Sequence, residues 1–60
     1  MEGNPMLAKH QYYSLAFIDA ITRDVPTAIM LGKDCFYWVV DRDEEGRYSL
    51  DGCLLLTYGI

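Results

Sequence analysis

Six consecutive apolar residues, 35–40 (Cys-Phe-Tyr-Trp-Val-Val), constrain the fold of this 60-residue chain more than any other feature. The run is rich in aromatic and β-branched side chains, which favour a strand over a helix. It is also far shorter than the ~18 apolar residues that suggest a membrane span. Because successive strand residues point to opposite faces, alternate members of the run must point away from a helix packed on one face.

Composition limits the remaining choices. A 60-residue chain makes one small domain, since a second would be too short to bury its own core. With 52% hydrophobic residues the chain collapses and is not disordered. A formal net charge of −4 is unfavourable for direct, non-specific binding to nucleic acid, which needs clustered Lys and Arg.

The first third of the chain has a helical pattern. Asn4 suits an N-cap and Pro5 the first helical position, and the spacing predicts a helix over about 5–23. Asp19 and Arg23 form a favourable i,i+4 pair near its end. The apolar stripe expected to face the core comprises Met6, His10, Tyr13, Phe17, Ala20 and Ile21. Three further apolar residues lie off this stripe and are free to meet a partner: Leu7, Leu15 and Ile18.

The rest of the chain is predicted to form strands, over about 27–31, 35–41, 47–50 and 53–58. For 27–31 a short helix is the rival interpretation, beginning after Asp24 and ending at Gly32. The polar residues 41–46 are expected to form a hairpin loop. The predicted architecture is a single α+β domain spanning 1–60, with one N-terminal helix packed on a small antiparallel β-meander of three or four strands.

Strand register stays open at this point. The favoured alignment sets Val40 opposite Tyr48 and, if Asp51-Gly52 is a bulge, Cys35 opposite Cys53. If Asp51-Gly52 is a turn instead, the two thiols are not neighbours. A slip of one residue would send every side chain to the other face.

The apolar runs exceed what one small core can hide, so we expect a homo-oligomer or another bound protein. In the favoured register Tyr37, Val39 and Leu55 lie on the face away from the helix, and we expect Trp38 to join them in an aromatic contact face. An acidic hairpin tip, comprising Asp43, Glu44 and Glu45, completes the predicted interaction surface. The favoured function is a small non-enzymatic interaction module, self-associating, in an accessory or inhibitory role.

Catalysis and cofactor binding have little support. His10 is a lone histidine within an apolar stripe, and neither Cys35 nor Cys53 lies in a catalytic motif. We therefore expect no enzyme activity, no cofactor and no zinc site, for which the ligands are too few.

Two alternative functions remain. Residues 41–46 resemble the start of a calcium loop, but position 12 would be Gly52, where a bidentate Glu is needed. A metal- or redox-responsive protein using this loop, or the Cys35/Cys53 pair, is one alternative. An acidic decoy of nucleic acid is the other. The two cysteines, Cys35 and Cys53, are expected to be reduced and partly buried. With no basic leader before an apolar stretch, we expect a cytoplasmic location and no membrane contact.

Overall fold

A computed structural model describes residues 6–59 of the chain. Its elements, in chain order, are β1 (Met6–His10), α1 (Tyr13–Thr22), β2 (Thr27–Gly32), β3 (Tyr37–Asp41), the 3₁₀ helix η1 (Arg42–Tyr48) and β4 (Gly52–Tyr58). Four strands form one sheet in the order β1-β3-β2-β4, and every neighbouring pair is antiparallel. The predicted α+β class, with one helix on an antiparallel sheet, is confirmed.

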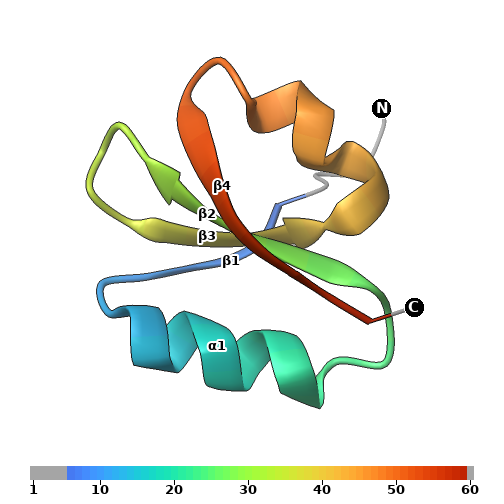
Figure 1. Ribbon diagram of the computed structural model, residues 1–60. Coiled ribbons are helices and arrows are strands. Elements are labelled where there is room, and N and C mark those ends of the chain that lie inside the picture. Colours follow the sequence, from blue (N-terminus) through green and yellow to red (C-terminus); the bar gives the residue numbers. More distant parts are fainter. Residues whose placement is uncertain (1–5, 60) are drawn as a thin grey trace.

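The sheet lies between two covering layers (Figure 1). α1 packs on one face, over a cluster made of Ala16, Ala20, Ile29 and Val39. On the other face lies a second cluster, against which Tyr48 of η1 packs, made of Ala28, Met30, Trp38 and Val40. Consecutive apolar residues in β2 and β3 therefore alternate between two buried faces.

The start of the chain differs from the prediction. Residues 6–10 form strand β1, and the helix begins at Tyr13, after this strand. β3 has two edges, and β1 pairs with the edge that β2 leaves free. In residues 6–10, pairing with β3 therefore outweighs the helical spacing of the apolar residues. The N-cap and first-turn roles predicted for Asn4 and Pro5 fall outside the described residues.

The predicted strand over 47–50 and the hairpin loop over 41–46 are also wrong. Arg42–Tyr48 is a 3₁₀ helix, which Asp41 caps by accepting a hydrogen bond from the Asp43 backbone N–H at 2.9 Å. Within it, the Arg47 guanidinium donates to the Glu44 carboxylate at 2.6 Å. These local bonds of the acidic side chains stabilise turns over an extended strand.

The strand predicted over 27–31 is confirmed, and the rival short helix is wrong. β4 pairs with β2 and not with β3, so the favoured register is overturned. Leu31 is the partner of Cys53, while Cys35 lies in the β2–β3 turn with φ 70°. The predicted cross-strand pairing of the two thiols therefore does not occur. The chain is not a meander, because α1 carries it from β1, across β3, to β2.

Candidate protein-interaction surface

Helix α1 is oriented with its smallest apolar residues inward. Its buried residues are Ala16 and Ala20, one helical turn apart, and both are fully buried. Small side chains let the helix axis approach the sheet closely. The large apolar side chains of α1 are 37% to 55% exposed, and we call them the helix patch: Tyr13, Leu15, Phe17, Ile18 and Ile21.

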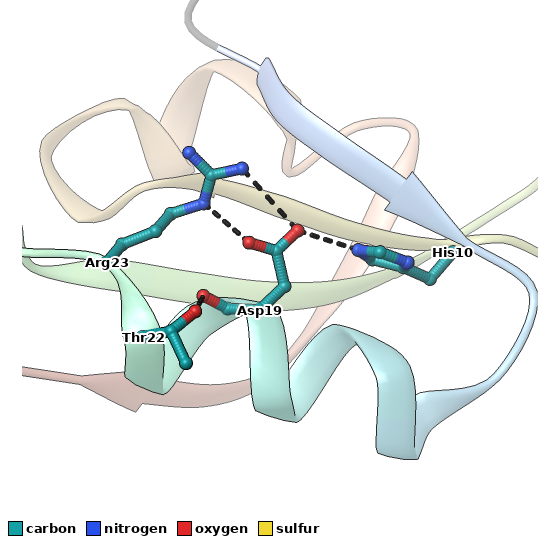
Figure 2. A network of polar contacts seen from close by, with 4 residues as sticks. All are labelled: His10, Asp19, Thr22 and Arg23. Carbon is teal, nitrogen blue, oxygen red and sulfur yellow. Dashed lines mark hydrogen bonds and ion pairs between the residues drawn. The ribbon is translucent and has the colours of Figure 1, made fainter.

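A polar network fixes this orientation (Figure 2). Asp19 accepts from His10 Nε2 of β1 at 2.7 Å and from Arg23 Nε at 2.8 Å. The Thr22 hydroxyl donates to the Asp19 backbone carbonyl at 2.9 Å. Burial opposes ionisation of Asp19, but the hydrogen bonds from His10 and Arg23 outweigh it and lower the pKa of the carboxyl below its ordinary 3.8. The charged side of α1 therefore faces β1.

The flank of α1 opposite Asp19 faces the β4 edge of the sheet. At 100° per residue, Phe17 and Ile21 lie on the side of the helix away from Asp19. α1 packs against β1, β3 and β2, and Leu56 of β4 reaches the same buried cluster. Phe17 and Ile21 of the helix patch thus border the side on which β4 lies.

Strand β4 is an edge strand with an apolar, uncharged sequence, Gly-Cys-Leu-Leu-Leu-Thr-Tyr. Leu54, Leu55 and Tyr58 are 41% to 44% exposed. The register with β2 shifts between Ile29 and Met30, which leaves Leu55 as the extra residue of a bulge. In the described part of the chain no strand pairs with the outer side of β4, so this edge of the sheet is unpaired.

Of the residues predicted to form the interaction surface, some are buried in the structure and others are exposed. Val39 is fully buried and Trp38 is 6% exposed, so the expectation that they form an accessible face is wrong. Tyr37 is half-buried, with its ring edge-on to Tyr13 at 5.8 Å between centroids. Of the predicted apolar contact residues, Leu55 is the one left well exposed. The prediction placed Tyr37 and Val39 on the face away from the helix, whereas both lie on the face that α1 covers, and Trp38 lies on the opposite face, which η1 covers.

Trp38 is buried because several elements close around its ring. Its Nε1–H donates to the Asp34 carboxylate at 3.2 Å, and the Lys9 ammonium lies 5.6 Å from the ring centroid. The Tyr48 ring meets it edge-on, at 5.8 Å between centroids. A Cβ at Gly32 would overlap the ring, so glycine is required there for close packing.

The acidic residues stay together but not at a hairpin tip. Asp43 is exposed, while Glu44 and Glu45 are half-buried, and all three lie in η1, across the sheet from α1. The Asp41 and Glu44 carboxylates are engaged within η1 itself. Among residues 6–59 there is no group of three or more His, Cys, Asp or Glu side chains that could hold a metal ion.

The two cysteines are free thiols, and both are exposed. The expectation that they are partly buried is therefore wrong. In the part of the chain that the structure describes, no helix is long and apolar enough to span a membrane.

Sequence reasoning found part of this surface. Leu15 and Ile18, which lie off the main stripe, are exposed as expected, whereas Leu7 packs against the buried cluster. Phe17 and Ile21 were assigned to the core-facing stripe and lie instead on the exposed flank. The signal that could have revealed this is the Ala16/Ala20 pair, because alanines at i,i+4 mark the side of closest approach.

Comparisons with known proteins add no relative: no protein-family model, curated protein or solved structure matches the chain.

Proposed function

We propose that this protein is a small non-enzymatic interaction module that associates with itself and binds another protein through the helix patch. The observation that carries the proposal is the orientation of α1. Its alanines contact the sheet, while five large apolar side chains are at least 37% exposed. A surface helix normally buries its large apolar residues, so an exposed set of this size supports a binding role.

The charge distribution supports the same proposal. Within α1 the one charged residue is Asp19, which is paired with His10 and Arg23. The acidic residues of η1 lie on the opposite face of the sheet. Two chains of net charge −4 can therefore meet on their α1 and β4 sides without bringing the η1 carboxylates together.

The test of self-association is the molar mass by light scattering, across a series from micromolar to millimolar chain concentration. We expect the mass to rise to twice the 6.9 kDa of the monomer, that is, to 13.8 kDa. High salt should not abolish the dimer, because an apolar contact is not screened. A constant monomer mass across the series contradicts the proposal.

The test of the helix patch uses a matched pair of variants. Ile18→Lys places a charge on the most exposed large side chain of the patch, and Gly46→Lys places the same charge in η1, across the sheet from α1, where a Cβ meets nothing within 4 Å. A protein partner that uses the helix patch is captured by the wild type and by Gly46→Lys and is lost with Ile18→Lys. A partner that Ile18→Lys retains does not use the helix patch.

A further inference from the structure

We infer that two copies of the chain pair along the outer edges of their β4 strands, in antiparallel orientation, to form one continuous sheet. This inference rests on the proposed self-association and names the surface that carries it. Each copy contributes a four-stranded sheet, so the dimer would contain one sheet of 2 × 4 = 8 strands. The two β4 strands would lie at its centre.

The first support is the direction of the backbone groups in β4. The Lys33 N–H donates to the Asp51 carbonyl at 2.8 Å, so the chain is hydrogen-bonded toward β2 at this position. In an antiparallel ladder, residue pairs that share hydrogen bonds alternate with pairs that do not. Counting from Lys33 and Asp51, the next hydrogen-bonded pair is therefore Leu31 and Cys53. The neighbouring residue in β2 follows the same alternation. The Gly32 N–H points to the β3 side, where it donates to the Phe36 carbonyl at 2.8 Å.

It follows that the N–H and C=O groups of Gly52 and Leu54 point away from β2, to the open edge. These groups are what an added strand needs, because strand addition is driven by main-chain hydrogen bonds. An antiparallel edge is also self-complementary, since a two-fold axis lets each copy offer donors and acceptors to the other.

The second support is the lack of protection on this edge. Edge strands normally carry a charged residue that prevents pairing, and β4 carries none over its seven residues. Leu54 and Leu55 are both more than 40% exposed, and a second β4 strand would cover part of that surface.

The third support selects a second copy as the occupant. The chain is acidic, with net charge −4, so two copies repel wherever their charged surfaces meet. The seven uncharged residues of β4 are the sheet edge where they can meet without like charges. The two-fold axis of such a pair is perpendicular to the sheet, so both α1 helices lie on one face. Both helix patches then remain available, side by side, for another protein.

The test is a pair of variants at Leu54. Leu54→Pro removes an outward N–H and leaves the β2–β4 hydrogen bonds intact, whereas Leu54→Thr removes the same side chain but keeps the N–H. We expect Leu54→Pro to weaken the dimer by roughly 30- to 100-fold, because a symmetric pair loses the bond twice, and Leu54→Thr to stay within roughly tenfold of wild type. Molar mass across the concentration series measures both.

A second pair keeps the test valid if Leu54→Pro does not fold, which a thermal melt by circular dichroism would show. Thr57 is exposed on β4, and Thr57→Lys adds an edge charge while Thr57→Val adds none. We expect Thr57→Lys to dissociate the dimer and Thr57→Val to preserve it.

The outcomes separate this inference from the proposed function. If the wild type is monomeric at every concentration, both fail. If the wild type dimerises, Ile18→Lys dissociates it, and neither Leu54→Pro nor Thr57→Lys does, the chain self-associates through α1 and the β4 inference is overturned. The inference holds if a folded Leu54→Pro dissociates the dimer and Leu54→Thr does not. It holds equally if Thr57→Lys dissociates the dimer and Thr57→Val does not.

Discussion

The two edges of the sheet, β1 and β4, differ in how well they are protected against pairing with another strand. β1 is tied to the molecule by charge: the Lys9 ammonium lies 2.9 Å from the Asp34 carboxylate, and His10 bonds Asp19 of α1 at 2.7 Å. Its register with β3 also shifts between Met6 and Ala8. β4 has no charged residue, although it too contains a bulge, at Leu55.

The difference indicates which edge is closed and which is open. A lysine on an edge strand opposes pairing with another chain, and β1 has one in Lys9. β4 combines free backbone groups with exposed leucines, the combination that promotes pairing. The bulge limits the length of regular pairing on β4 but leaves the segment before it, around Gly52 and Leu54, in a regular register.

The largest expected effect of the point changes below concerns Trp38, whose ring packs over Gly32 and Gly52 and under Lys9, and so connects both edges. Gly32→Ala would place a methyl group into the ring. We expect it to lower the free energy of unfolding by about 1–3 kcal/mol, as overpacking of a core does. Urea denaturation measures the loss. Gly46→Ala is the control, because a Cβ at Gly46 meets nothing within 4 Å. Equal stability of the two variants would contradict the described packing.

The next effect tests the attachment of α1 to β1. Asp19→Asn removes the charge that His10 and Arg23 share, and we expect a loss of about 1–2 kcal/mol near neutral pH. The pKa of Asp19 is lower in the folded state than its ordinary 3.8, so its stabilisation is complete above that value. The stabilisation is lost as the pH falls through the lowered pKa.

The difference in unfolding free energy between wild type and Asp19→Asn should therefore shrink on acidification. Denaturation at a series of pH values measures it. Asp34, whose pKa the Lys9 hydrogen bond lowers most strongly, is present in both proteins, so its titration cancels. A difference that stays constant down to the lowest pH would contradict the role of the Asp19 charge.

The smallest effect on stability is expected at Lys9. Its ion pair with Asp34 is exposed, so Lys9→Val should change the free energy of unfolding by less than about 1 kcal/mol. The variant should, however, open the β1 edge to pairing. We expect a molar mass above that of wild type at equal concentration, while Lys9→Arg, which keeps the charge, matches wild type. An unchanged mass for Lys9→Val would show that charge does not protect this edge.

Part of this architecture could be predicted from local sequence. β2 and β3 were predicted because their β-branched and aromatic residues favour strands whatever their partners. β1 was missed because Met6–His10 fits a helical stripe that continues into α1, and only its pairing with β3 makes it a strand. Long-range pairing of this kind leaves no local signal.

The candidate surface was harder to predict, for a related reason. Trp38 is buried because η1 covers the second face of the sheet, and residues 42–48 resemble a polar loop in sequence. Val39 is buried because it lies on the face that α1 covers, which depends on a strand order that local sequence does not reveal. Leu15 and Ile18 were recognised because their position off the stripe follows from helical geometry alone. The open edge at β4 required the strand order, which the apolar pattern does not encode.

The most direct measurement is amide hydrogen exchange of the two edges at chain concentrations below and above the dissociation constant of the dimer. We predict that the Gly52 and Leu54 amides exchange at least roughly tenfold more slowly at high concentration, because a second strand bonds them. The Ala8 and Lys9 amides of β1 should exchange at the same rate in both samples. Slower exchange confined to β1, or no change in β4 in a sample that is fully dimeric, would contradict the account.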